Sequence, residues 1–174
     1  DLKAGQPETT AAFGQKYYGH ITKTSSPKQR DYLAAFWPQS QSHFDEIKYI
    51  VEDGLNLFEK LFGYRSRSFI PCNYVLPEAL EAVTARLGVE LIQGQRGQLR
   101  PSSDGSTVSV RRSYTGERNE YGQLYSVRNV KFEPFEDPSR DWVASAMREI
   151  KSAFFWGTPA IISTHRVNYV SGMD

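Results

Sequence analysis

The sequence contains a single cysteine, Cys72, and only three histidines in 174 residues. One cysteine cannot form a disulfide within the chain, so a small disulfide-stapled scaffold is excluded. The histidines are His20, His43 and His165, and no H-x-x-x-H, H-E-x-x-H or C-x-x-C pattern occurs. Such patterns encode most compact metal sites, and their absence argues against a locally encoded metal site in this chain.

The sequence also lacks an excess of charge of either sign. Lys and Arg number 21 and Asp and Glu number 20, so the formal net charge of +1 gives no global electrostatic argument for nucleic acid or anionic lipid. No apolar run approaches the ~18 residues that span a bilayer, and we expect no membrane partner. G-x-S-x-G and phosphate-loop motifs are absent, which weakens the case for a common α/β serine hydrolase or a nucleoside-triphosphate enzyme.

Length and composition favour one globular domain over residues 1–174. With 39% hydrophobic and 24% charged residues, the chain can bury a core without a disulfide or a metal. The sequence opens at Asp1 on a polar stretch without a Met. We therefore expect it to be a piece of a larger domain, with part of the chemistry upstream.

Hydrophobic spacing predicts alternating helices and strands from residue 42 onward. A helix is expected over 43–62, with Ser42 as its N-cap. Short buried strands are expected over 67–71 and 89–93, on either side of a helix over 77–88. Two strands separated by one helix are the sequence pattern of a parallel βαβ unit.

The second half of the chain begins with an expected insertion. Residues 94–122 are rich in Gly, Ser, Arg and Pro and are expected to form an inserted loop or hairpin. A strand over 124–132, a helix from Asp137 and a short buried strand over 159–163 follow. Six apolar residues of this helix are expected to face the core: Trp142, Val143, Ala146, Met147, Ile150 and Phe154. The element order is typical of an α/β fold with a mainly parallel sheet.

Polar residues that follow the expected strands are the best site candidates, because ligands of parallel α/β folds bind outside the carboxyl ends of the strands. This rule selects a set that can meet on one rim: Cys72, Asn73, Glu133, Glu136, Asp137, Asp141, His165, Arg166 and Asn168. His165 is the strongest single candidate, because an imidazole titrates near neutral pH and can transfer a proton or ligate a metal. The structural alternative is a histidine that is hydrogen-bonded at a strand end or simply exposed.

Two weaker candidates have stronger structural alternatives. Asp137 and Asp141 with Trp142 can bind a sugar through carboxylates and ring stacking, but a helix cap, a dipole partner and a core tryptophan explain the same residues. Cys72 needs a neighbouring cation or base to act as a nucleophile, and a buried inert cysteine is the favoured interpretation.

Residues 95–131 carry more cations than carboxylates, with tyrosines between them. Such a region can bind single-stranded nucleic acid or an acidic polysaccharide. A solvated loop is the commoner explanation of this composition. The cations are Arg96, Arg100, Arg111, Arg112, Arg118, Arg128 and Lys131.

Two segments resemble motifs of the polysaccharide deacetylases, a family of carbohydrate esterases. Residues 62–73 (FGYRSRSFIPCN) look like the third family motif and residues 159–168 (PAIISTHRVN) like the last, while Asp141-Trp142 resembles the fourth. The similarity covers residues 42–174 and is closest to an uncharacterised bacterial branch of polysaccharide (de)acetylases.

The resemblance implies a distorted (β/α) barrel, of which this chain would form the carboxyl-terminal portion, and metal-dependent removal of acetyl groups from a sugar polymer. In such enzymes one Asp and two His hold a divalent ion, commonly zinc, a second Asp activates water, and a last-motif histidine protonates the leaving group. His165 matches that histidine as the catalytic acid. Asn73, Asp141 and Trp142 are then expected on the substrate side of the rim.

The sequence departs from the family pattern where the metal is bound. The paired-Asp first motif and the H-x-x-x-H second motif are absent, Ile70 stands where an Arg is usual, and Ser163 replaces a leucine of the last motif. We therefore expect a zinc ion in the complete parent, no metal ligands in this chain, and no activity of this chain alone.

Two other functions stay open. A non-catalytic carbohydrate-binding module would keep the polar and aromatic rim without an acid or a metal. A nucleic-acid-binding domain would use residues 95–131, and it is the less favoured of the two. In the favoured interpretation, the partner is a polysaccharide or oligosaccharide substrate.

Overall fold

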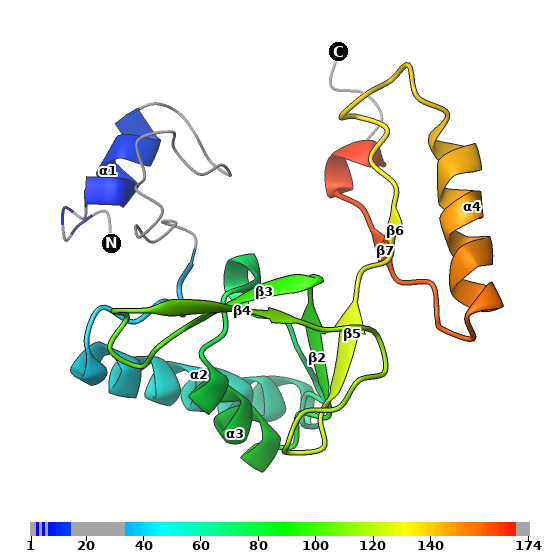
Figure 1. Cartoon of the computed structure of the whole chain (residues 1–174). Coiled ribbons are helices and arrows are strands. Elements are labelled where there is room, and N and C mark those ends of the chain that lie inside the picture. The colour runs from blue at the N-terminus through cyan, green and yellow to red at the C-terminus, as the bar shows by residue number, and fades with distance from the viewer. Residues whose placement is uncertain (1–2, 4, 6, 15–33, 170–174) are drawn as a thin grey trace.

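The structure, a computed structural model, describes residues 3, 5, 7–14 and 34–169. From residue 34 onward the chain forms an N-terminal region, residues 34–127, and a C-terminal region, residues 128–169. Figure 1 shows that the C-terminal region extends away from the N-terminal region where the chain passes from residue 127 to residue 128. The short helix α1 (Pro7–Gly14) lies on the other side of the molecule.

The N-terminal region is built on a parallel sheet with the strand order β1-β2-β5. Its strands are β1 (Ser68–Phe69), β2 (Leu91–Gly94) and β5 (Leu124–Val127). The 3-10 turn η1 (Cys72–Tyr74) and helix α3 (Glu78–Arg86) connect β1 to β2, which pair in parallel. The predicted βαβ unit is therefore confirmed, although its strands are shorter than the predicted ranges. The prediction that the first strand is buried was wrong, because Ser68 is exposed and Phe69 is half-buried.

Helix α2 (Gln41–Phe62) packs beside α3 and covers the sheet (Figure 1). The core between the helices and the sheet consists of nine buried residues: Phe44, Ile47, Val51, Leu76, Leu80, Val83, Ile92, Tyr125 and Val127. The predicted N-cap was wrong, because Ser40 rather than Ser42 accepts the hydrogen bond from the His43 amide at 3.1 Å. The helix thus begins two residues earlier than Ser42 would allow.

The predicted insertion forms an antiparallel hairpin of β3 (Gly97–Pro101) and β4 (Val108–Arg112), so the hairpin alternative is confirmed. The hairpin is attached to the rest of the region, because the Leu76 amide donates to the Leu99 carbonyl at 3.0 Å. Leu99 also packs against the buried residues Trp37 and Val75.

The C-terminal region repeats the βαβ arrangement on a smaller scale. Strands β6 (Val130–Lys131) and β7 (Ile162–Ser163) pair in parallel, and helix α4 (Trp142–Phe155) connects them. The strand predicted over 124–132 is divided into β5 and β6 by residues 128–129, where the chain leaves one sheet for the other. The 3-10 turn η2 (Arg166–Asn168) follows β7.

Three predictions about α4 and β7 were wrong. The helix begins after Asp141 rather than at Asp137, because Asp141 accepts the Ala144 amide as N-cap, whereas Asp137 accepts from Ser139 within the preceding turn. Of the six residues expected to face the core, Trp142 and Ala146 are buried, but three are largely exposed: Val143, Met147 and Phe154. β7 is half exposed rather than buried, because it lies in a sheet of only two strands and Ile162 is 51% exposed.

The fold is therefore mixed α/β with parallel sheets, as the sequence predicts. The described strands form a three-stranded sheet, a two-stranded parallel sheet and the hairpin, and no closed barrel is seen among them. None of the described helices is long and apolar enough to cross a membrane.

Candidate functional site: a buried glutamate that holds an exposed histidine

Glu133 and His165 meet just beyond the carboxyl ends of β6 and β7. The register pairs Val130 with Ile162 and Lys131 with Ser163, so two residues further along, Glu133 lies opposite His165. His165 Nδ1 lies 2.7 Å from Glu133 Oε1. The prediction that polar residues after neighbouring strands meet on one rim is confirmed for this pair.

Asn168 completes the cluster from the turn η2, which brings it back over the end of β6. Its Nδ2 donates to Glu133 Oε2 at 2.7 Å, and its Oδ1 accepts from the Phe135 amide at 2.9 Å. Both carboxylate oxygens of Glu133 therefore have a partner, and the residue is only 2% exposed. We name these three residues the Glu133–His165–Asn168 cluster.

The cluster favours an ionised carboxylate. Burial by itself raises the pKa of Glu133, but the hydrogen bonds from Asn168 and His165, with attraction to the charged imidazole, lower the pKa below its usual value overall. An ionised carboxylate only accepts hydrogen bonds, so His165 Nδ1 must carry a proton.

The orientation of His165 follows from this bond. With Nδ1 directed at Glu133, the other ring nitrogen, Nε2, has no hydrogen-bond partner among the described residues, and the side chain is 71% exposed. A buried carboxylate that holds one imidazole nitrogen fixes the orientation of the ring and leaves the other nitrogen facing solvent. The arrangement can therefore donate or accept a proton at Nε2.

The other predicted site residues lie in the turn η1 and at the start of α4. Asn73 is exposed in η1, with a φ of 52° in the left-handed region. Asp141 accepts from the Ala144 amide at 2.9 Å, and Trp142 is 5% exposed, with its Nε1 donating to the Asp137 carbonyl at 2.8 Å. Asp141 and Trp142 thus have the local partners that a helix start provides, and their role in substrate binding stays a prediction.

The prediction that Cys72 is a buried cysteine was wrong. The thiol is free and exposed rather than buried. Cys72 begins the turn η1 rather than ending a strand, and the next two residues, Asn73 and Tyr74, both have positive φ.

The residues present do not fit the metal that the family resemblance implies. Among residues 7–14 and 34–169, no group of three or more His, Cys, Asp or Glu side chains is placed to hold an ion. The cluster offers one histidine and one carboxylate, and both oxygens of the carboxylate are already bonded. His20 lies outside the described residues. The described side chains therefore give no basis for assigning a metal-dependent step to this chain.

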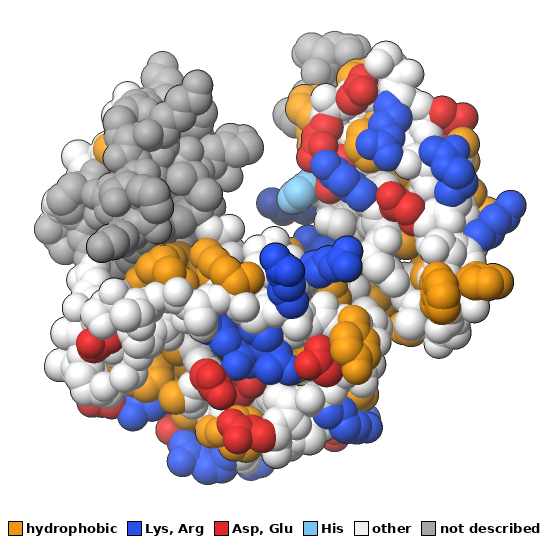
Figure 2. Space-filling view, viewed as in Figure 1, with side chains coloured by type: hydrophobic (Ala, Val, Ile, Leu, Met, Phe, Trp, Pro, Cys, Tyr) orange, Lys and Arg blue, Asp and Glu red, His pale blue; other side chains and the backbone are white. Residues whose placement is uncertain are grey.

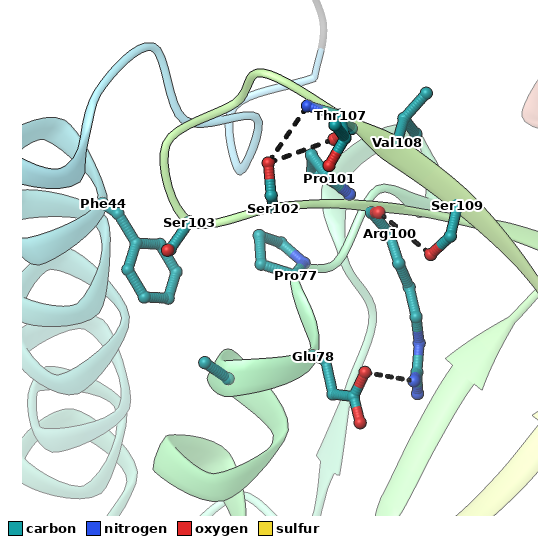
Figure 3. Close-up of a pocket in the computed structure, with 11 residues that line it drawn as sticks. Phe44, Pro77, Glu78, Arg100, Pro101, Ser102, Ser103, Thr107, Val108 and Ser109 are labelled. Atoms are coloured by element: carbon teal, nitrogen blue, oxygen red, sulfur yellow. Dashed lines mark hydrogen bonds and ion pairs between the residues drawn. The ribbon is translucent and has the colours of Figure 1, made fainter.

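A pocket of about 460 Å³ lies between the hairpin and the start of α3, and we name it the hairpin pocket (Figure 3). Its polar groups bond one another. Arg100 pairs with Glu78 at 3.2 Å, and Ser102 Oγ accepts from the Thr107 amide at 3.1 Å. Because these groups close the hairpin on itself and on α3, the pocket is better explained by the fold than by a ligand.

Sequence reasoning selected His165 but did not identify Glu133 as its partner. Glu133 and Asn168 were among the residues that follow the strands, and the missing signal was the register, since a pairing of 130 with 162 already places 133 opposite 165. Comparisons of the chain with protein-family models, with curated proteins and with solved structures found no match.

Proposed function

We propose that the chain is the carboxyl-terminal part of a polysaccharide deacetylase-like hydrolase that removes acetyl groups from a sugar polymer, with His165 as the general acid. The observation that supports this most is the exposed imidazole of His165, held at Nδ1 by the buried carboxylate of Glu133. This is the place at the end of a strand that the family resemblance gives to its catalytic histidine.

The proposal includes a fold. The parallel strands β1, β2, β5, β6 and β7 would be part of the wall of a distorted (β/α) barrel, and a parent chain would supply the other strands. Two parallel βαβ units in succession support this arrangement.

His165 acts on the leaving group in this proposal. Water adds to the acetyl carbon and gives its proton to a base that the parent protein would supply. When this adduct collapses, the bond between the acetyl carbon and the sugar nitrogen or oxygen breaks, its electron pair goes to the sugar atom, which takes the proton from His165 Nε2, and acetate is released. The imidazole ends neutral, and Glu133 keeps the Nδ1 proton in place throughout. Asn168 is a positioning residue, because it acts through Glu133.

The predicted substrate residues keep a more limited place in the proposal. Asn73 is exposed beyond the end of β1, and the proposal keeps it on the substrate side of the rim. Trp142 is buried, so we expect Asp141 and Trp142 to support the rim rather than to stack on a sugar.

The test is acetate release by the parent protein from an N-acetylated and an O-acetylated oligosaccharide. We expect His165→Ala to lower kcat by about 10²- to 10⁴-fold while glycan binding is kept. His43→Ala is the matched control, because His43 lies on α2 and its Nδ1 accepts from the Gln39 amide at 3.1 Å.

Acetate release that is unchanged in His165→Ala would overturn the proposal. Glycan binding without acetate release by any form of the protein would favour the non-catalytic carbohydrate-binding module.

A further inference from the structure

A second pocket of about 480 Å³, which we name the basic pocket, opens between the hairpin and the junction of β5 with β6. Three of the residues that line it are cations and none is a carboxylate. The described residues that line it are Arg96, Ser113, Tyr114, Thr115, Val127, Arg128, Asn129, Lys131 and Thr158. Figure 2 shows Lys and Arg side chains gathered in the hollow between the N-terminal and C-terminal regions.

The basic pocket lies at the ligand-binding edge of the parallel sheet. Gly94, the last residue of β2, pairs with Val127, the last residue of β5. Arg96 and Arg128 follow these two strand ends within two residues. Two guanidinium groups therefore extend from neighbouring strands at the edge where parallel α/β folds bind ligands.

Neither arginine forms an ion pair with a carboxylate of residues 34–169. Arg96 has no ion-pair partner among the described residues. Arg128 has no carboxylate partner there either, because its guanidinium stacks 5.1 Å from the Tyr74 ring and its Nη1 lies 3.4 Å from Ser163 Oγ. These contacts fix the position of Arg128 without cancelling its charge.

Other cations of the same stretch are paired instead. Arg111 pairs with Glu117 at 2.6 Å, and Arg100 pairs with the buried Glu81 at 2.5 Å. Lys131 at the margin of the basic pocket pairs with Glu136. Arg112 and Arg118 have no carboxylate partner among the described residues, but neither of them lines the basic pocket. The basic pocket therefore holds two of the four arginines of residues 95–131 that lack such a partner there.

We propose that the basic pocket binds the carboxylate of an acidic sugar unit, and that the polymer is therefore a polysaccharide containing uronic acid. The proposal deepens the proposed function and rests on it. Planar guanidinium groups match a carboxylate with paired hydrogen bonds, and the exposed ring of Tyr114 offers a face for the apolar side of a sugar.

The basic pocket is connected to the candidate acid through β7. Arg128 bonds to Ser163, which lies two residues before His165 on the same strand end. A polymer that crosses this edge would place an acidic unit in the basic pocket close to the acetylated unit at His165.

A nucleic acid is less well matched. Strands of nucleic acid are held by a long basic groove with several stacking rings, whereas this pocket has one exposed ring and two unpaired arginines. The net charge of +1 also gives no general attraction to a polyphosphate.

The test is titration calorimetry of the 174-residue chain with an oligo-uronate and with a neutral oligosaccharide of equal length. We expect the oligo-uronate to bind more tightly, and we expect Arg96→Gln and Arg128→Gln each to weaken it about tenfold or more. Arg148→Gln is the matched control, because it removes the same charge from an exposed position on α4. Circular dichroism of each variant verifies that it is folded.

The inference would be overturned if the chain bound the neutral and the acidic oligosaccharide equally tightly, or if it bound neither. It would also be overturned if Arg96→Gln and Arg128→Gln both left the affinity for the oligo-uronate unchanged. Tighter binding of a single-stranded oligonucleotide, with the same dependence on Arg96 and Arg128, would overturn it in favour of nucleic acid. These binding measurements are independent of acetate release by His165→Ala, so a failure of this inference is distinguishable from a failure of the proposed function.

Discussion

The N-terminal and C-terminal regions use the same βαβ unit but bury very different amounts of apolar surface. In the N-terminal region, α2 and a third strand enclose the unit around a continuous core. In the C-terminal region, α4 packs on two short strands, and its outward residues are open, with Val143 65% and Phe155 80% exposed. The candidate acid lies on the region with the smaller core, where local opening costs less free energy.

Each region also holds one buried carboxylate, and the partners differ. Glu81 is enclosed by Arg100 and by the Tyr125 hydroxyl, which donates to it at 2.8 Å. Glu133 instead leads to an imidazole that faces solvent. A buried carboxylate with only buried partners stabilises a fold, whereas one that orients an exposed titratable group can serve chemistry.

The largest expected effect tests the difference in burial. Leu80 is fully buried, so Leu80→Ala should lower the free energy of unfolding by about 2–5 kcal/mol through lost burial and a cavity. Met147, on the outward side of α4, is 46% exposed, and Met147→Ala should change the free energy of unfolding by less than about 0.5 kcal/mol. Urea denaturation measures both. An equal cost for the two variants would mean that the outer face of α4 is covered in solution.

The next effect concerns the acid side of the pH range. Glu133→Gln removes a carboxylate that accepts two hydrogen bonds, which should cost about 1–3 kcal/mol at neutral pH. Because folding lowers the pKa of Glu133, its contribution is complete above the usual value of 4.5 and is lost as the pH falls through the folded pKa. The difference in unfolding free energy between wild type and variant should therefore shrink in acid.

The control for this series is Glu46→Gln, which makes the same substitution at an exposed glutamate of α2. A wild-type minus Glu133→Gln difference that stays constant from neutral to acidic pH would contradict the assigned ionisation of Glu133.

A smaller effect separates the two roles of Asp141. Asp141→Ala should lower the unfolding free energy by about 1 kcal/mol, because it removes the side-chain cap on the Ala144 amide. Asp141→Ser restores a capping oxygen and should recover most of this loss. If Asp141 only caps α4, Asp141→Ser restores both the stability and the acetate release of the parent protein. If Asp141 also contacts the sugar, Asp141→Ser restores the stability but not the acetate release.

Local rules predicted most of the elements, because each depends on residues close together in the sequence. The helix over 77–88, the hairpin within 94–122 and the parallel strands around them follow from spacing and turn residues. The prediction failed where burial depends on distant segments. The exposure of Phe154 and Ile162 depends on what packs against α4 and against β7 from outside this segment, which no pattern within 137–163 encodes.

The candidate site shows the same division. His165 is predictable from its place after a strand, because that rule needs only the strand itself. Its bond to Glu133 depends on the register between two strands that are 32 residues apart in sequence. The interpretation of Asp137 failed for a local reason, since Asp141 is an equally good cap and it is the one that α4 uses.

The last effect compares the hydrogen bonds of the two buried glutamates at alkaline pH, where the Tyr125 hydroxyl beside Glu81 titrates. Burial, with the hydrogen bond to Glu81, raises the pKa of Tyr125 to about 12 from 10.0. The folded state therefore keeps the phenol proton at a pH where the unfolded chain loses it, so this contribution is complete below pH 10.0 and is lost as the pH rises to about 12.

Tyr125→Phe should cost about 0.5–1.5 kcal/mol at neutral pH and should flatten the alkaline fall in stability. Tyr49→Phe, which removes a hydroxyl from a ring that is 70% exposed, should leave that fall in place. The measurement is the free energy of unfolding of the wild type and of both variants across the alkaline pH range. If the stability of Tyr125→Phe falls at alkaline pH as the wild type's does, burial and Glu81 do not hold the proton on the Tyr125 hydroxyl. The surroundings of Glu81 and of Glu133 would then differ in solvent exposure less than their geometry indicates.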